Sequence, residues 1–242
     1  MKLSGIIQLD GTITLRSGLH IGSGNMEMHI GGTDNPVIKH PYTLEPYIPG
    51  SSLKGKIRSL MELASGLVPE TRGEPVGLKT LKVVQGNPAL VRKAEIILQI
   101  FGHAPTGSDS EKDVLERLGP TRVAFADCPL DEGWLKKAKE NHWPLTEEKS
   151  ENSINRIQGT AQNPRYTERV PAGAEFRFRL SFKVLKDGDR ELFEELLKGL
   201  KLLEGDALGG SGSRGYGRIE FTRLHQDGQD ITARFRQDIK AV

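Results

Sequence analysis

The sequence predicts an α+β fold of the RRM-like (ferredoxin-like) type, with strands and helices in the order β-α-β-β-α-β. Two amphipathic helical segments, 51–66 and 189–204, each lie between segments whose apolar residues recur at every second position. Each helix has an apolar stripe along one side and can therefore pack on a sheet. This order is that of a four-stranded sheet backed by two helices, a unit that we call the palm, and two further segments are inserted into it.

The first part of the chain contains a predicted strand, a long loop and the first helix. From residue 7 to residue 16 apolar and polar residues alternate, as in a half-buried strand. Residues 17–49 are rich in Gly, His, Asn and Pro and show no sustained period, which is typical of a long structured loop that carries function. Ser51 is the expected start of the helix, which ends near Gly66.

The later part of the chain supplies the other three strands and the second helix. Residues 122–127 and 176–184 are predicted strands, and the last strand spans 216–224. Asp189 is expected to cap the second helix and Gly205 to end it. The aromatic residues on these strands are expected in the core, not on an open platform for stacking RNA bases.

Between the first helix and the second strand lies a first insertion into what we expect to be a single domain of residues 1–242. This segment, about 66–120, mixes Gly and Pro breaks with two plausible helices, 89–100 and 111–118. We expect it to form a helical lid or finger region beside the palm.

A second insertion, about 141–173, is polar and basic. Gly159 and the Asn163-Pro164 pair indicate the tip of a protruding β-hairpin, a thumb-like element. Arg156 and Arg165 belong to a locally arginine-rich stretch, and arginine suits both phosphate binding and stacking on bases. An ordinary solvent-exposed hairpin is the alternative.

Composition excludes several classes of protein. The chain has 242 residues, of which 36% are hydrophobic, and a formal net charge of only +2, so any affinity for nucleic acid must come from local clusters of Lys and Arg. The single cysteine, Cys128, excludes an internal disulfide, and no zinc-ligand spacing is present. The lack of a long apolar run or a leader predicts a soluble cytoplasmic protein without a membrane partner.

Residues 205–217 contain six glycines in thirteen positions, between the second helix and the last strand. Such a cluster indicates turns with positive φ or a backbone pressed against a ligand, and Arg214 makes phosphate the obvious ligand. Gly210, Gly212 and Gly215 match the letters of the dinucleotide fingerprint, but a helix precedes them and a strand follows, the reverse of that motif. A flexible hairpin-like turn is the alternative.

The start of the first helix is a second candidate anion site. Lys54 and Arg58 are four residues apart and face together, near the hydroxyls of Ser51 and Ser52 at the positive end of the helix. A solvated basic face is the alternative. Residues 50–57 also resemble a P-loop, with 123–127 as a Walker B strand, but Ile57 stands where the magnesium-binding hydroxyl is needed.

Two residues of the long loop could carry chemistry. Asp34 lies in a glycine-flanked turn before Asn35 and Pro36, where an Asx-type turn is the alternative to a catalytic carboxylate. His20 is a possible acid or base, although a single loop histidine is more often only hydrogen-bonded.

Five motifs in order give the chain a family resemblance. They are Gly-Leu-His-Ile-Gly at 18–22, Gly-Thr-Asp-Asn-Pro at 32–36, Tyr-Ile-Pro-Gly-Ser-Ser-Leu-Lys-Gly-Lys at 47–56, Glu-Arg-Val-Pro-Ala-Gly at 168–173 and the glycine-rich run at 208–217. Together they resemble the RAMP superfamily of CRISPR proteins, and within it the repeated backbone subunits of type III-A Csm effector complexes. None of these motifs is specific alone, but their combination covers nearly the whole chain.

The resemblance implies a homo-oligomeric ribonucleoprotein of antiviral defence, in which copies of the chain polymerise along a CRISPR guide RNA that pairs with a target RNA. The other implied partners are the large signalling subunit, the small subunit and the subunit that caps the guide 5′ end. The hairpin 155–168 would displace one base at regular intervals. The implied RNA-binding residues are His20, Ser51, Ser52, Lys54, Arg58, Arg156, Arg165, Gly210, Gly212, Arg214 and Gly215.

The resemblance also implies that Asp34 cleaves target RNA with a divalent metal ion, Mg²⁺ or alternatively Mn²⁺, which makes the chain a metal-dependent endoribonuclease. A single carboxylate suffices for Mg²⁺, which completes its octahedron with water and phosphate oxygens. Other possibilities are a guide-binding subunit without activity, the equivalent type III-B subunit, a guide-processing enzyme and an NTPase.

Overall fold

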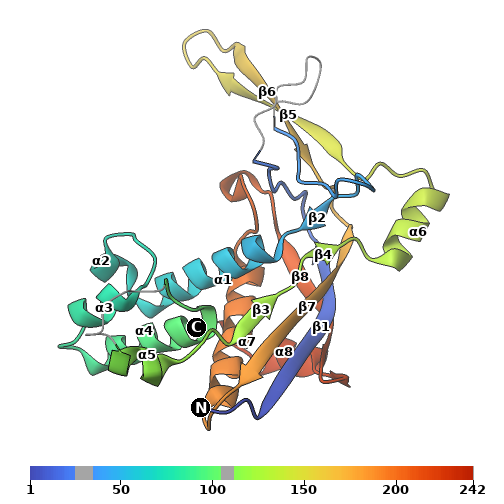
Figure 1. The fold of residues 1–242 in the computed structure, drawn as a ribbon. Helices are drawn as coiled ribbons and strands as arrows, with labels where there is room; N and C mark the ends of the chain where they lie inside the picture. The colour runs from blue at the N-terminus through green and yellow to red at the C-terminus, as the bar shows by residue number, and fades with distance from the viewer. Residues whose placement is uncertain (25–34, 105–111, 242) are drawn as a thin grey trace.

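The computed structural model describes residues 1–24, 35–104 and 112–241 and is built on one antiparallel sheet (Figure 1). The strand order is β3-β7-β1-β8-β9. Its strands are β1 (Gly5–Leu15), β3 (Val123–Phe125), β7 (Glu175–Val184), β8 (Ile219–Gln226) and β9 (Gln229–Asp230).

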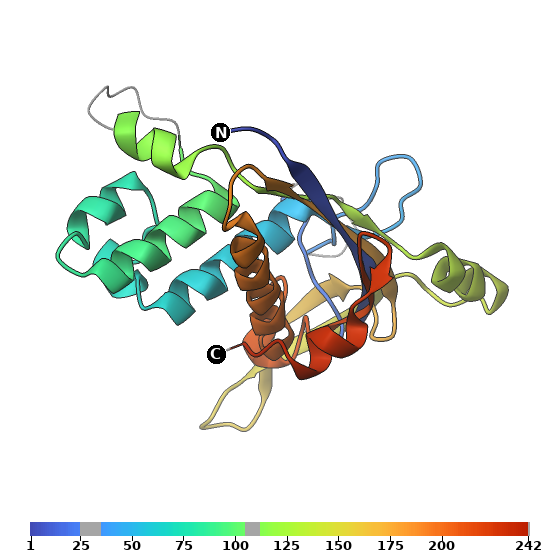
Figure 2. The ribbon, with the colours of Figure 1, turned by 90° about the horizontal axis from the view of Figure 1, so that it is seen from below.

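Two long helices cover one face of this sheet, α1 (Gly50–Ser65) and α7 (Asp189–Gly205), as the views from two sides show (Figures 1 and 2). They approach closely at Gly199, where a Cβ would lie 2.7 Å from the Met61 Sδ. The chain order β1-α1-β3-β7-α7-β8 confirms the predicted ferredoxin-like fold. The strand β9 and the helix α8 (Thr232–Gln237) extend it in a way that the sequence did not indicate.

Phenylalanines from several elements form the core between sheet and helices. Phe178 and Phe221 meet edge to face at 5.0 Å between ring centroids, and Phe182 meets Phe193 of α7 at 5.5 Å. All four are almost completely buried. The expectation that the strand aromatics build the core is therefore confirmed, and these rings are not available to stack on bases.

The first insertion is helical, with α2 (Val68–Thr71), α3 (Leu78–Val83), α4 (Pro88–Phe101) and α5 (Lys112–Leu118). It packs on α1 at one side of the palm (Figure 1). Arg122, just after it, is fully buried and its guanidinium donates to the carboxylate of Asp189. Asp189 is therefore not the expected cap: Gly188 caps α7, while Asp189 accepts from Arg122 and from the Leu185 N–H.

The second insertion is a two-stranded hairpin, β5 (Glu147–Ile154) and β6 (Ala161–Arg169), which projects from the palm (Figure 1). Gly159 lies in the predicted tip, with φ of 69°. The expectation for Asn163-Pro164 was wrong: both residues lie within β6, where Asn163 has φ of 52°. This local irregularity lies opposite a register shift in β5 between Glu151 and Ser153.

A minor sheet joins the start of α1 to the connection after β3. It consists of β2 (Tyr47–Ile48) and β4 (Cys128–Pro129), and the helix α6 (Glu132–Glu140) follows. The P-loop alternative for residues 50–57 is wrong, because that motif connects a strand of a parallel sheet to its helix, whereas β2 is a two-residue antiparallel strand.

Candidate nucleic-acid interface

A cavity of about 360 Å³ at the base of the hairpin brings together three of the predicted RNA-binding residues. His20 comes from the segment after β1, Arg165 from β6 and Arg214 from the glycine-rich loop. The remaining lining residues are polar: Asn35, Glu151, Asn152, Ser153, Asn163, Thr167 and Ser211. Segments far apart in the sequence thus form one polar site beside the hairpin.

The imidazole of His20 has a defined hydrogen-bond partner. Its Nδ1 lies 2.7 Å from the Glu168 carbonyl oxygen, which can only accept, so Nδ1 carries the proton. In the neutral ring Nε2 is then left as an acceptor. A Cβ at Gly22 or at Gly210 would lie 3.5 Å from this ring, so both glycines border it closely. His20 can accept a hydrogen bond from a ribose hydroxyl at this position.

The glycine-rich loop needs its glycines for its own conformation. Gly209 has φ of 73°, and a Cβ there would lie 2.2 Å from the His20 carbonyl oxygen. Gly210 donates its N–H to the same oxygen at 2.9 Å. Gly215 and Gly217 also have positive φ, of 84° and 72°. The predicted positive-φ turns are confirmed, and the loop is packed against the segment that carries His20.

Arg214 lies at the edge of the cavity, within the short helix η2 (Gly212–Arg214). Its Nε lies 2.8 Å from Glu151 Oε2 on the hairpin, and its side chain is still 57% exposed. Arg165 is exposed on β6 and has no ion-pair partner within the described part of the chain. A phosphate at the cavity could therefore bind the guanidinium of Arg165, which has no ion pair within the described residues, and that of Arg214, which already pairs with Glu151.

Asp34, the predicted catalytic residue, lies outside the described residues, which resume at its neighbour Asn35. Asn35 forms a parallel bridge with Thr167, and its carbonyl oxygen accepts from the Glu168 N–H at 3.2 Å. Asn35 also lines the cavity. The described structure thus resumes after Asp34 at the base of the hairpin, beside His20 and Arg165.

Glu168 holds the segment that follows Asn35. Its carboxylate accepts from the Lys39 Nζ at 2.5 Å and from the Val37 N–H at 2.9 Å. Burial raises the pKa of this carboxyl, but hydrogen bonds from Lys39, Thr146 and Val37 outweigh burial and hold the pKa below its usual range. Sequence reasoning placed Glu168 in a family motif and missed this role, because nothing local indicates a partner 129 positions away.

The start of α1 is partly occupied by protein groups. Pro49, not Ser51, is the N-cap residue, and Asp127 Oδ1 accepts from the Gly50 N–H at 2.8 Å. A Cβ at Gly50 would lie 2.6 Å from the Phe125 carbonyl oxygen, so the helix start is packed tightly against the end of β3. Ser51 is exposed and Ser52 half-buried. Their hydroxyls are the accessible groups here.

The predicted pair of Lys54 and Arg58 divides into two roles. Arg58 donates to Glu62 at 2.8 Å, to the Val76 carbonyl at 2.5 Å and to the Gly102 carbonyl at 3.3 Å. It therefore fastens α1 to the helical insertion, and its expected role in an open anion clamp does not fit these contacts. Sequence spacing showed correctly that the two cations share a side of the helix but not that one was already bound.

Lys54 is half-buried and has no ion-pair partner among residues 1–24, 35–104 and 112–241. Burial, and then the positive charge of Arg58, lower the pKa of its ammonium group. The negative charge of an incoming phosphate would favour the ammonium form and so offset both effects. Two residues further, the Lys56 Nζ lies 2.6 Å from Asp206 Oδ2, which joins this helix start to the glycine-rich loop.

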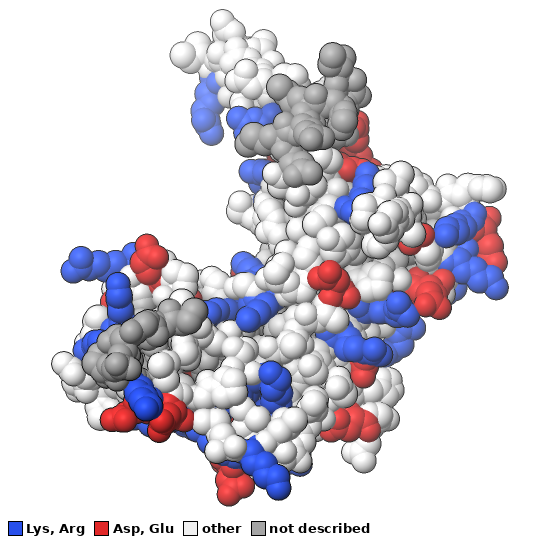
Figure 3. Space-filling view, viewed as in Figure 1, with Lys and Arg blue, Asp and Glu red and all other residues white. Residues whose placement is uncertain are grey.

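The hairpin presents basic and apolar groups to solvent. Arg156 is exposed at its tip, and Ile157 beside it is 97% exposed, an apolar residue that sequence reasoning missed. In the space-filling view Lys and Arg side chains lie on the side of the hairpin that faces the helical insertion, across a concave region of the surface (Figure 3).

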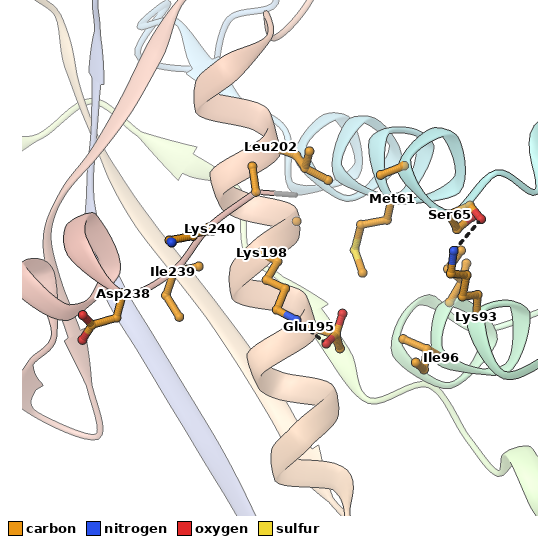
Figure 4. A pocket seen from close by; sticks show the side chains of 14 residues that line it. Met61, Ser65, Lys93, Ile96, Glu195, Lys198, Leu202, Asp238, Ile239 and Lys240 are labelled. Carbon is orange, nitrogen blue, oxygen red and sulfur yellow. Dashed lines mark hydrogen bonds and ion pairs between the residues drawn. The ribbon is translucent and has the colours of Figure 1, made fainter. Parts of the chain in front are cut away.

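A separate groove of about 430 Å³ lies between α1, α4, α7 and the C-terminal segment (Figure 4). Its surface is largely apolar, with Met61, Ile96 and Leu202. Lys198 is paired with Glu195 at 2.7 Å, and Lys93 donates to the Ser65 carbonyl at 3.2 Å. The groove contains none of the predicted site residues.

Other candidate chemistries receive no support. Within the described ranges, no three His, Cys, Asp or Glu side chains lie together as metal ligands would. The buried Cys128 has its pKa raised by burial to about 12, so its thiol is unreactive. Among the helices that the structure describes, none has the length and apolarity that crossing a membrane requires.

The chain resembles known proteins in sequence and in structure. A family model described as the RAMP superfamily matches residues 12–220. The CRISPR system Cms endoribonuclease Csm3 of Methanothermobacter thermautotrophicus is 42% identical, over 89% of this chain and 83% of that protein. The Csm3 crystal structure from Methanopyrus kandleri is 28% identical with a TM-score of 0.56, over 91% of this chain and 76% of that one.

A further solved structure is a Csm3–Csm4 subcomplex in the type III-A CRISPR-Cas interference complex. One of its chains is 30% identical to this chain with a TM-score of 0.53, over 93% of this chain and 79% of that one.

Proposed function

Because this chain belongs to the RAMP superfamily, we propose that it is the backbone subunit of a type III-A CRISPR effector complex that holds guide RNA and cleaves the paired target RNA. The similarity to Csm3 endoribonucleases supports this function. The observation that carries it is the convergence of His20, Arg165 and Arg214 with Asn35 around one cavity. Such a complex acts on transcripts, so we place it in the cytoplasm.

The guide RNA binds along the glycine-rich loop and the start of α1. Lys56 and Asp206 join these two elements, and Ser51, Ser52 and Lys54 lie on the helix start. Hydroxyls and a lysine without a partner in the described chain suit phosphates and riboses, and they carry no preference for base sequence. Copies of the chain assemble along the guide, and a Csm4-like subunit is a further partner, as the Csm3–Csm4 subcomplex suggests.

The hairpin contacts the duplex of guide and target. Its tip offers Ile157 beside Arg156, an apolar side chain next to a cation. Apolar side chains that enter a base step unstack it, and neighbouring cations hold the phosphates. Since the hairpin base carries Arg165 and adjoins Asn35, an unstacked nucleotide would lie close to the loop that contains Asp34.

Asp34 is the proposed catalytic residue. The only carboxylate that the described residues bring to the cavity beside Asn35 is that of Glu151, which already accepts from Arg214 and Tyr216. A hard cation such as Mg²⁺ or Mn²⁺ needs few protein ligands when phosphate and water oxygens complete its shell. Asp34 would hold this ion together with water and phosphate oxygens, and the bound ion would stabilise negative charge on the scissile phosphate. Arg165 and Arg214 neutralise neighbouring phosphates, and His20 Nε2 orients a ribose hydroxyl.

The test is Asp34→Ala in the complex assembled with guide and complementary target. Cleavage should be lost while guide and target affinities stay within about threefold, because the role of the carboxylate is confined to the chemical step. Asp238→Ala, in the separate groove of Figure 4, is the matched control and should cleave normally. Full cleavage by Asp34→Ala would refute the assigned role. No cleavage by the unmodified chain would favour a purely structural guide-binding subunit.

A further inference from the structure

The aromatic ring of Tyr216 lies at the joint between the glycine-rich loop and the hairpin. It is fully buried. The Lys149 Nζ lies 4.5 Å from the ring centroid, and the Arg169 Cζ lies 5.0 Å from it. Lys149 belongs to β5 and Arg169 to β6, so one ring contacts cations from both strands.

The hydroxyl of Tyr216 adds a directional contact to the same hairpin. It donates to Glu151 Oε1 at 3.1 Å, and the other oxygen of that carboxylate accepts from Arg214. Burial and the hydrogen bond to Glu151 raise the pKa of the phenol, so it remains a donor at neutral pH. Tyr216 therefore contacts the hairpin through its hydroxyl as well as through its ring.

The backbone around the joint leaves little freedom. Tyr216 stands between Gly215 and Gly217, and Gly217 donates its N–H to the Gly18 carbonyl at 2.9 Å. A Cβ at Gly18 would lie 2.5 Å from the Arg169 side chain, so the arginine can lie over the ring only because this residue is glycine. The loop, the hairpin and the segment after β1 thus meet at a single packed point.

A two-stranded hairpin has little stability of its own in water. The distal part of this one, with Ile154 and Ile157, is exposed on the described surface. Its direction must therefore be set at its base. We infer that Tyr216 is a positioning residue for RNA cleavage, which holds the hairpin at one angle to the glycine-rich loop and so selects the phosphodiester bond that is cut. This inference rests on the proposed function.

The experiment compares Tyr216→Phe with Tyr216→Leu in the assembled complex. Phenylalanine keeps the ring in contact with the two cations. The Tyr216→Phe complex should therefore cut at the same positions, at a rate within about threefold of the original. Leucine loses both cation contacts and the hydroxyl. Its single-turnover rate should fall about 10- to 100-fold, and cuts should spread to neighbouring phosphodiester bonds, while guide affinity stays within about threefold.

Amide hydrogen exchange supplies a readout that does not depend on cleavage. Amides of residues 147–169 should exchange faster in Tyr216→Leu than in Tyr216→Phe. Tyr42→Leu is the matched control, since that tyrosine is 91% exposed, and it should leave both exchange and cleavage unchanged. If the unmodified complex does not cleave, the proposed function fails, but the exchange comparison still tests the joint.

Two results would overturn the inference. One is a folded Tyr216→Leu complex that cuts at the original positions at the original rate. The other is an equal loss of guide binding and cleavage, which would make Tyr216 part of the guide site alone. If Tyr216→Leu does not fold, Lys149→Ala against Lys149→Arg makes the same comparison, because this side chain is 35% exposed and its loss leaves the core intact. Unchanged cleavage positions in Lys149→Ala would then refute the inference.

Discussion

The Lys39 ammonium lies 2.5 Å from the carboxylate of Glu168, a residue at the end of β6, and this pair joins the segment after Asn35 to the base of the hairpin. Glu168 has a side chain only 10% exposed. Because the same carboxylate also accepts from the Val37 N–H, one side chain determines how the long loop re-enters the palm.

Glu168→Gln should slow target cleavage at neutral pH while guide binding is kept. The amide preserves the shape but loses the charge that holds Lys39, and the weakened contact should lower the free energy of unfolding by about 1–3 kcal/mol. Cleavage rate and denaturant unfolding measure the two effects. An unchanged cleavage rate would show that this anchor does not affect the action proposed for Asp34.

Lowering the pH should reproduce part of the loss of stability expected for Glu168→Gln. The pKa of Glu168 is lowered in the folded chain from an ordinary value of 4.5, so its contribution to stability is complete above that pH and is lost as pH falls through the folded pKa. Between pH 5 and pH 3, about the range in which acidic side chains titrate, the unfolding free energy should fall more for the original chain than for Glu168→Gln. Parallel pH curves for the two proteins would contradict this.

Lys54 and Arg58 should respond differently to substitution by alanine. Lys54→Ala should weaken guide binding and reduce the slope of log affinity against log salt by about 0.7 for one lost phosphate contact on single-stranded RNA. The measurement is binding at several salt concentrations. Lys198→Ala, whose lysine is paired with Glu195 away from the site, is the control. A slope equal to that of the control would remove Lys54 from the interface.

Arg58→Ala should act mainly on stability. It leaves the buried Glu62 carboxylate without its guanidinium and frees the Val76 and Gly102 carbonyls, at a cost of about 1–3 kcal/mol in unfolding free energy. Denaturant unfolding checks this value. A change in the salt slope without a change in stability would instead return Arg58 to the predicted anion clamp.

Ile157→Ala should leave folding intact, because the side chain is 97% exposed and such surface changes usually alter stability by less than about 0.5 kcal/mol. Target unstacking should weaken, and cleavage should slow at each regular position. Fluorescence of 2-aminopurine at the displaced base reports the unstacking directly. Leu44→Ala, at a residue 67% exposed outside the hairpin, is the control; identical fluorescence in both variants would exclude Ile157 as the wedge.

Local patterns predicted most of the fold. The alternation in β1 and β7 and the amphipathic stripes of α1 and α7 appear in the structure close to their expected bounds, because burial against a core imposes those periods on neighbouring residues. The errors lie where a cap or tip depends on distant groups. Aspartate commonly caps helices, yet Asp189 is bound to Arg122, 67 positions earlier.

The candidate site was predictable as a set of residue types but not as an arrangement. Motifs indicated His20 and Arg214, a locally arginine-rich stretch indicated Arg165, and the structure places all three around one cavity. They could not show that Arg58 is bound within the chain, that Glu168 holds Lys39, or that Tyr216 lies under two cations from the hairpin. Such contacts join residues that lie far apart in the sequence, so no local repeat of apolar and polar residues can indicate them.

The sequence alone thus determined the β-α-β-β-α-β palm and the glycine-rich loop, since apolar spacing and glycine conformation are properties of neighbouring residues. Only the tertiary structure decided which cations remain available to RNA and how the hairpin is held. Those properties depend on which charged groups the folded chain brings within a few ångströms of one another, and ion pairs made inside the protein remove side chains from the surface that a ligand can reach.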